Sequence, residues 1–118
     1  MDYTKIKSER QFRDATGYSK ENFQKLLIAY EDTYFKYVGQ TYEEYVEENV
    51  TEPPKLSTLG EGLFFVLFQL KNDLIFGSLG LVFDMSVSSA HVNFKYFLNL
   101  LEQTLEKKKS FRSARLKQ

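Results

Sequence analysis

Residues 77–91 read GSLGLVFDMSVSSAH, and this segment says more about the architecture than any other part of the chain. Its first part has helical spacing, with Leu79 and Phe83 on one face. Gly80 supplies a small residue where two helices could cross closely. A tight turn over residues 84–86 follows, and then a second helical pattern begins. Two helices joined in this way predict a helix-turn-helix unit.

The second helix of this unit should run over about residues 87–107, because its apolar positions keep helical spacing throughout. Met85 fits as the apolar anchor of the turn, Ser86 as the cap and Ala90 as the inward-facing residue one turn later. Residues expected on the outward face, where they can reach phosphates or base edges, are Ser86, Ser88, Ser89, His91, Val92 and Lys95. The same pattern also fits a tight corner between two helices of an ordinary bundle.

A third helix should begin after Thr58, since Thr58 and Glu61 have the spacing of a capping box. This helix is apolar nearly all round, at Leu59, Leu63, Phe64, Val66, Leu67, Phe68 and Leu70. Residues 63–68 alone could be misread as a buried strand, but the cap and the length favour a helix. A helix without a polar face belongs in the middle of a bundle.

The N-terminal half has the same helical organisation. Ser8 predicts the start of a short helix that ends at Gly17, and Ser19 predicts the start of a longer one that ends at Gly39. The apolar stripe of the longer helix consists of Phe23, Leu26, Leu27, Tyr30, Tyr34 and Val38. A Thr-x-x-Glu pattern at residues 41–44 predicts a further capped helix.

The adjacent prolines at 53 and 54 are the clearest break in the chain. We therefore expect an all-α fold, a small helical bundle of about five helices that contains a helix-turn-helix unit. Residues 1–106 would form a single helical domain, with N-terminal helices (1–50), a proline-containing linker (51–57) and a helix-turn-helix half (58–106), followed by a basic tail (107–118).

The charges are unevenly distributed although the net charge is zero. Residues 31–52 are strongly acidic, whereas residues 107–118 are basic and contain no acid. We expect the tail, including Lys107, Lys108, Lys109 and Arg112, to contact DNA phosphates without sequence preference. The alternative is that both segments are solvated helix faces.

The composition also limits the kinds of function. The chain has 118 residues and no cysteine, so disulfides and thiolate metal sites are excluded. No serine–histidine–aspartate set, phosphate-binding glycine loop or metal-ligand spacing stands out, so we expect neither an enzyme nor a cofactor or small-molecule substrate. Neither of the two longest apolar runs, residues 63–68 and residues 74–83, approaches the ~20 residues of a membrane span. A cytoplasmic protein is therefore expected.

Three segments resemble the N-terminal region of bacterial insertion-sequence transposases of the DDE (Asp-Asp-Glu) class. They are FRDATGYSKENF at 12–23, LFFVLFQLK at 63–71, and the helix-turn-helix region at 76–98 with its MSVSSAH turn at 85–91. The resemblance implies a DNA-binding helix-turn-helix that precedes a nuclease domain. That nuclease domain is not represented in these 118 residues.

The chain departs from the family pattern at four positions. Val87 and Val92 stand where the family often has arginine, and Asp84 stands where it usually has a glycine. Asn93 replaces a residue that is commonly apolar. Loss of both arginines would remove contacts that each carry about 1–3 kcal/mol of base discrimination.

Three functional hypotheses follow. The first is a truncated or stand-alone transposase-type module that binds double-stranded DNA through the helix starting near Val87, without nuclease activity. The second is a protein-interaction module that forms a homodimer or regulates a full-length transposase, through Val87, Val92 and an aromatic surface of Tyr30, Tyr34, Tyr37, Tyr42 and Tyr45. The third is a transposase remnant without a function.

Overall fold

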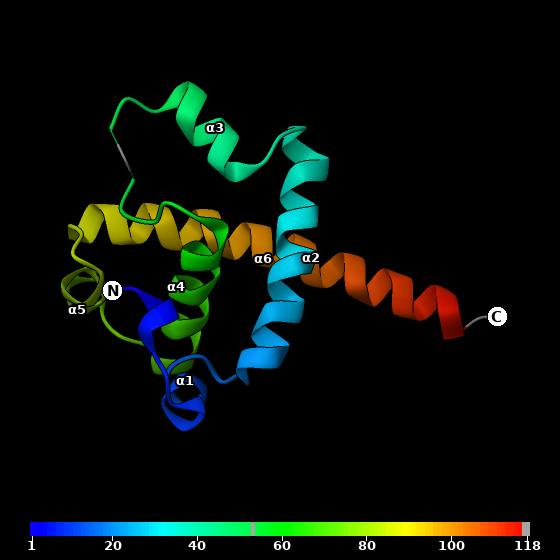
Figure 1. Cartoon of the computed structure of the whole chain (residues 1–118), viewed down its shortest axis with the longest axis horizontal. Coiled ribbons are helices and arrows are strands. Elements are labelled where there is room, and N and C mark those ends of the chain that lie inside the picture. The colour runs from blue at the N-terminus through cyan, green and yellow to red at the C-terminus, as the bar shows by residue number, and fades with distance from the viewer. Residues whose placement is uncertain (53, 117–118) are drawn as a thin grey trace.

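The computed structural model describes residues 1–52 and 54–116, with side chains through Lys108. Within these residues the chain forms one 3₁₀ turn and six α-helices (Figure 1). They are η1 (Tyr3–Lys5), α1 (Glu9–Thr16), α2 (Lys20–Val38), α3 (Tyr42–Asn49), α4 (Leu59–Asn72), α5 (Phe76–Phe83) and α6 (Val87–Leu116). The all-α fold predicted from the sequence is confirmed.

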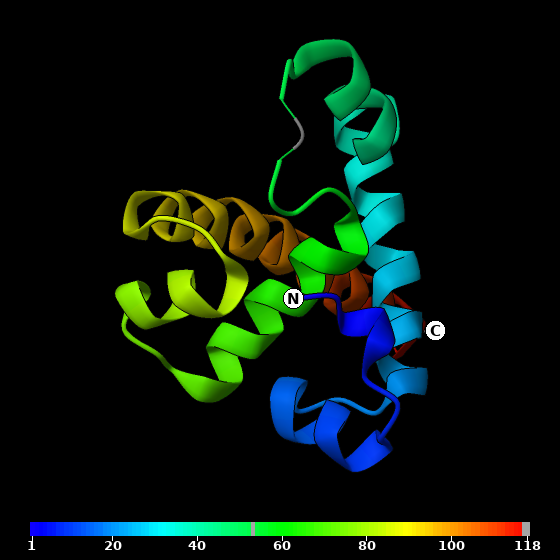
Figure 2. The same ribbon diagram turned by 60° about the vertical axis from the view of Figure 1, so that its left-hand side comes forward.

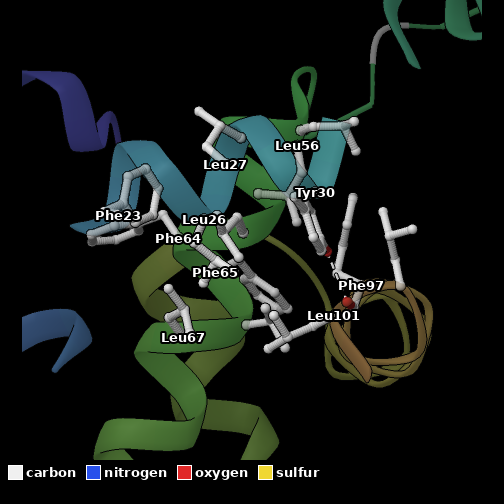
Figure 3. Packing of buried hydrophobic residues seen from close by; sticks show 14 of the residues in the cluster. Phe23, Leu26, Leu27, Tyr30, Leu56, Phe64, Phe65, Leu67, Phe97 and Leu101 are labelled. Carbon is white, nitrogen blue, oxygen red and sulfur yellow. Dashed lines mark hydrogen bonds between the residues drawn. The ribbon is translucent and has the colours of Figure 1, made fainter. Parts of the chain in front are cut away.

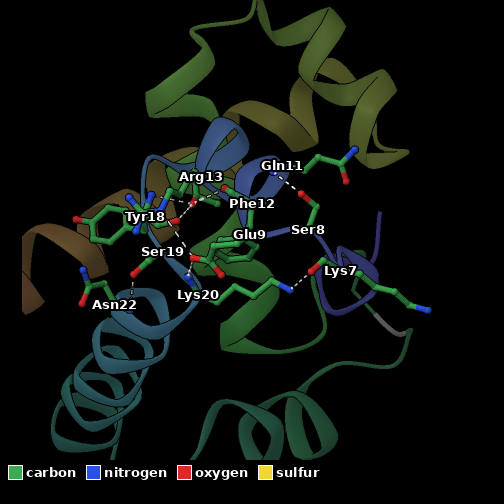
Figure 4. A network of polar contacts seen from close by, with 11 residues as sticks. Lys7, Ser8, Glu9, Gln11, Phe12, Arg13, Tyr18, Ser19, Lys20 and Asn22 are labelled. Atoms are coloured by element: carbon green, nitrogen blue, oxygen red, sulfur yellow. Dashed lines mark hydrogen bonds and ion pairs between the residues drawn. The ribbon is translucent and has the colours of Figure 1, made fainter.

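Local signals place the ends of the N-terminal helices where the sequence predicted them. Ser8 and Ser19 each accept a hydrogen bond from the backbone N–H three residues later. Gly17 and Gly39 end α1 and α2 in the left-handed conformation, at φ 78° and 86°. A glycine is suited to this conformation because it has no Cβ. The corner between α1 and α2 is also held by the backbone N–H of Lys20, which donates to the Glu9 carboxylate at 2.9 Å (Figure 4).

The two predicted capping boxes differ. Thr41 and Glu44 form a complete one at the start of α3. At the start of α4, Thr58 Oγ1 accepts from the Glu61 N–H at 3.1 Å, but the Glu61 carboxylate accepts from the backbone of Ser57 at 3.0 Å instead of Thr58. The predicted reciprocal bond is therefore wrong by one residue. The Ser57 hydroxyl, 3.3 Å from Glu61 Oε1, offers the carboxylate a second donor there.

Helix α4 lies in the middle of the bundle, where α1, α2 and α6 all pack against it (Figure 2). Its Phe64 is 1% exposed, and the ring lies near those of Tyr3, Phe12 and Phe83, which come from both halves of the chain. The predicted central position is confirmed. Leu70 is the exception, because it is 52% exposed.

Helices α2 and α6 cross beside α4 (Figure 3). The buried Tyr30 hydroxyl donates to the Phe97 carbonyl at 2.7 Å. Gly62 of α4 leaves the space that the Phe97 ring fills, and a Cβ at this position would collide with that ring. The predicted apolar stripe of α2 ends in an exposed residue, Val38. Leu105, near the end of the helical pattern predicted for residues 87–107, is also exposed.

Two further contacts connect the linker and the last helix to the body. The Tyr42 hydroxyl donates to the Leu56 carbonyl at 2.9 Å, and burial raises the pKa of Tyr42 to about 12. Helix α6 does not end near Lys107 as predicted but continues to Leu116. The segment after Lys107 contains no proline or glycine that would end a helix. Its basic residues therefore continue α6 as far as Leu116.

Candidate nucleic-acid interface

The turn between α5 and α6 is held by its backbone. Asp84 ends α5 in the left-handed conformation at φ 55°. The Met85 N–H then donates to the Gly80 carbonyl at 2.8 Å. A Cβ at Gly80 would collide with the Met85 carbonyl oxygen. The need for a small residue at Gly80 is confirmed, and its cause is contact with the turn backbone rather than with the second helix.

The start of α6 is capped and anchored as predicted. Ser86 Oγ accepts from the Ser89 N–H at 3.1 Å, and Ala90 is fully buried. Met85 is partly buried and packs against the core. The Asn93 amide lies 3.7 Å from the Met85 sulfur, so this departure from the family pattern contributes to holding the turn.

The first turns of α6 present an exposed face. Ser88, Val92 and Lys95 are exposed and recur at helical spacing, and Asn99 continues the same stripe. Val92 is 68% exposed and Val87 is 51% exposed, so the residues at the two lost arginine positions are accessible. Ser86 is also exposed.

Two of the expected outward residues are more restricted. Ser89 is partly buried, and its hydroxyl lies 3.1 Å from that of Ser86. His91 is exposed, yet its ring stacks on Phe76 of α5 with centroids 3.9 Å apart. The sequence did not reveal this contact, because Phe76 is fifteen positions earlier and only the fold of the turn brings it close.

Lys55 is a residue of this region that sequence reasoning missed. Its ammonium lies 3.1 Å from the exposed Asp84 carboxylate, across the turn from the proline-containing segment. The pair borders a shallow groove of about 330 Å³ that includes Leu81 and Ser89. Because both side chains are exposed, the pair is worth about 0–1 kcal/mol, and its main effect is to offset the charge of Asp84.

The predicted basic residues of the tail are only partly described. Lys107 packs back on α2, with its ammonium 4.7 Å from the centre of the Tyr37 ring. Lys108 is exposed. The side chains of Lys109 and Arg112 lie outside the described residues, although the helix continues through both positions.

A comparison with protein families finds a similarity in the C-terminal half of the chain. Residues 54–107 match the family model described as the helix-turn-helix of DDE superfamily endonuclease, so this segment is similar to the helix-turn-helix of that family. The match covers α4, α5 and α6 through Lys107, and it confirms the resemblance found in the sequence. Neither a search of curated proteins nor one of solved structures finds a significant match.

The described residues contain no group of three or more histidine, cysteine, aspartate or glutamate side chains placed to hold a metal ion. No helix among them is long and apolar enough to cross a membrane.

Proposed function

We propose that the chain binds double-stranded DNA by placing the first turns of α6 in the major groove, and that it does so as a module without nuclease activity. The observation that carries the proposal is the exposed face of Ser88, Val92 and Lys95. This face is held outward by a capped turn within the segment that matches a transposase helix-turn-helix. A helix that begins at such a turn reads base edges with its first residues.

The chemistry of this face fits a specific kind of contact. Lys95 supplies a charge for a phosphate, and Ser88 supplies a hydroxyl for a phosphate or a base edge. Val87 and Val92 offer methyl groups, which suit the C5-methyl of thymine better than the guanine edge that arginine reads. We therefore expect a preference for A·T pairs in the major groove.

The end of α6 adds a second contact. Lys107 and Lys108, with Lys109 and Arg112 further along the same helix, would meet phosphates beside the recognition site. These contacts carry no sequence information but make binding sensitive to salt.

The experiment is fluorescence anisotropy with a labelled random-sequence duplex, at low and at moderate salt. Binding should weaken steeply as the salt concentration rises. Lys95→Ala should weaken binding and reduce the salt dependence by about one phosphate contact. His91→Ala should weaken binding less, because the ring is stacked on Phe76.

The matched control is Lys25→Ala, which removes the same charge from an exposed position on α2, outside the matched segment. This variant should bind as the unmodified protein does. Equal affinities for the Lys95 and Lys25 variants would contradict the role of α6, and no binding at low salt would contradict DNA binding altogether.

A second candidate function is association with another copy of the chain or with a full-length transposase. The exposed Val87 and Val92 favour it, together with Tyr37, which is 63% exposed, and Tyr45, which is 40% exposed. The aromatic surface predicted from the sequence is wrong in its other members, because Tyr30, Tyr34 and Tyr42 are buried in the core. Light scattering at high protein concentration tests self-association directly. A monomer under these conditions would remove the homodimer as a candidate.

A further inference from the structure

A groove lies between the second half of α2 and the middle of α6, with a volume of about 460 Å³. Tyr34, Tyr37 and Tyr96 line it together with three polar side chains, Lys95, Asn99 and Gln103. This volume lies within the range of about 300–1,000 Å³ that is typical of small-ligand sites. A mostly apolar lining with a few polar groups is also typical of such sites.

The aromatic side chains of the groove are accessible. Tyr34 is buried and contributes to the floor, whereas Tyr37 is 63% exposed and Tyr96 is 45% exposed. The Tyr37 ring carries the Lys107 ammonium on one side, 4.7 Å from its centre. Exposed rings beside lysines are the groups with which proteins stack the bases of single-stranded DNA.

The amide groups provide a hydrogen-bonding edge. Gln103 Nε2 donates to Asn99 Oδ1 at 2.6 Å, which orients both side chains on the exposed surface of α6. This bond leaves the Asn99 N–H groups as donors and the Gln103 carbonyl as an acceptor. A donor and an acceptor side by side complement the edge of a nucleobase.

The charge of the groove favours an anion. Among the described residues that line the groove, Lys95 is the one that carries a charge. Lys107 lies at the rim, over the ring of Tyr37. A nucleotide offers a planar ring for the tyrosines and a phosphate for the lysines. An uncharged apolar peptide would contact the tyrosines but would leave the lysines without a partner.

The groove is also continuous with the face that reads duplex DNA. Val92 and Lys95 belong both to the groove lining and to the outward stripe of α6. A strand that leaves a duplex bound at this stripe would therefore pass the tyrosines. Bases inside a duplex are stacked on each other on both faces, so an internal base must leave the duplex before it can stack on a side chain.

We propose that the groove between α2 and α6 binds an unpaired nucleotide of a DNA strand that extends from the duplex held by α6. The proposal rests on the proposed DNA-binding function and adds a ligand class to it: a nucleotide that is single-stranded, stacked on Tyr37 and Tyr96.

The test compares a blunt duplex with the same duplex carrying a three-nucleotide single-stranded overhang, using the full chain. Binding is measured by anisotropy, and 2-aminopurine at the first overhang position reports stacking by loss of fluorescence. We expect about tenfold tighter binding of the overhang duplex. Tyr37→Ala should abolish this preference and leave binding of the blunt duplex nearly unchanged.

The matched control is Phe35→Ala, which removes an aromatic side chain that is 50% exposed on the same helix but does not line the groove. It should keep the preference for the overhang. Circular dichroism of both variants verifies that the fold is retained.

The outcomes separate this proposal from the proposed function. Blunt-duplex binding without a preference for the overhang would overturn the groove proposal alone. If no duplex binds, the probe is a short single strand with 2-aminopurine, and unchanged fluorescence at high protein concentration would overturn it. A dimer that Tyr37→Ala dissociates would also overturn it, because the groove would then hold a second copy of the chain.

Discussion

Helices α1, α2, α4 and α5 all end in the left-handed conformation, but the two halves of the chain use different residues for it. In the N-terminal half, α1 and α2 end at Gly17 and Gly39, both left-handed. In the C-terminal half, α4 and α5 end at Asp73 and Asp84, which are also left-handed, at φ 49° and 55°. Aspartate tolerates this conformation less well than glycine.

This difference shows that the turns of the helix-turn-helix half depend on more than local preference. Around Asp84, Leu79 and Phe83 are buried, and Gly80 allows the turn backbone to pass closely. Near Asp73, the Gln69 amide donates to the Leu74 carbonyl at 2.7 Å and accepts from the Leu74 N–H at 3.2 Å. In the C-terminal half, packing and a buried amide stabilise left-handed helix ends that glycine adopts without such help in the N-terminal half.

The largest effect should come from the residue that joins the two halves. Phe64→Ala should lower the free energy of unfolding by about 3–5 kcal/mol, because its buried ring packs on rings from both halves. Urea unfolding measures the change. Leu70→Ala on the same helix is the control, and its exposed side chain should contribute about 1 kcal/mol or less. Similar losses for the two variants would contradict the central role of α4.

The next effect concerns the close approach inside the helix-turn-helix. Gly80→Ala should destabilise by about 1–3 kcal/mol, since the new methyl group collides with the Met85 carbonyl. Gly77→Ala, one turn earlier in α5, has only an ordinary contact at 3.9 Å with Val87. It should be neutral or stabilise by about 0.5–1 kcal/mol through helix propensity. Thermal unfolding of both variants measures the two changes in stability. A stabilising Gly80→Ala substitution would contradict the close approach of Gly80 to the Met85 carbonyl.

An intermediate effect tests how the N-terminal half holds the linker. Tyr42→Phe removes the hydrogen bond to the Leu56 carbonyl and should cost about 1 kcal/mol near pH 8. The pKa of Tyr42 is about 12 in the folded chain against 10.0 for an ordinary tyrosine. Its stabilising contribution is therefore complete below pH 10 and is lost as the pH rises towards 12.

The stability difference between the unmodified protein and the Tyr42→Phe variant should accordingly shrink as the pH rises above 10. Urea unfolding from pH 8 to pH 11 measures it. A difference that stays constant over this range would show that Tyr42 is not protected from ionisation in the folded chain.

The smallest effect tests the comparison between aspartate and glycine itself. Asp84→Gly and Asp73→Gly should each stabilise by less than about 1 kcal/mol, because relief at a left-handed residue is partly offset by the greater entropy of an unfolded glycine. Only Asp84→Gly should also strengthen DNA binding, since Asp84 lies in the turn before α6. Anisotropy measures DNA binding and thermal unfolding measures stability for both variants. Equal gains in DNA affinity would contradict the placement of Asp84, rather than Asp73, beside the bound DNA.

Features that depend on neighbouring residues were predictable from the sequence. Capping by Ser8, Ser19 and Ser86, and the left-handed ends at Gly17 and Gly39, involve groups within about one helical turn of each other. The periodicity of α4 and the α5–α6 turn are equally local. The capping bond of Glu61 was predicted one residue away from its position, because two adjacent donors compete for the carboxylate.

The candidate site was predictable only in outline. The outward positions Ser88, Val92 and Lys95 followed from helical periodicity once the start of α6 was known. Periodicity could not indicate that His91 would stack on Phe76 or that Lys55 would lie beside Asp84. Each of these contacts joins residues from different elements.

The sequence by itself therefore determined the order of the helices, the caps at Ser8, Ser19 and Ser86, the α5–α6 turn and the resemblance of the C-terminal half to a helix-turn-helix family. Each of these depends on residues close together in the chain or on a characteristic pattern. Only the tertiary structure decided that α2 crosses α6 at Tyr30 and Phe97, and that Tyr37 and Lys95 share one groove. The physical reason is that crossing angles and closest approaches are set by how side chains fill space between helices. That packing depends on all the helices together.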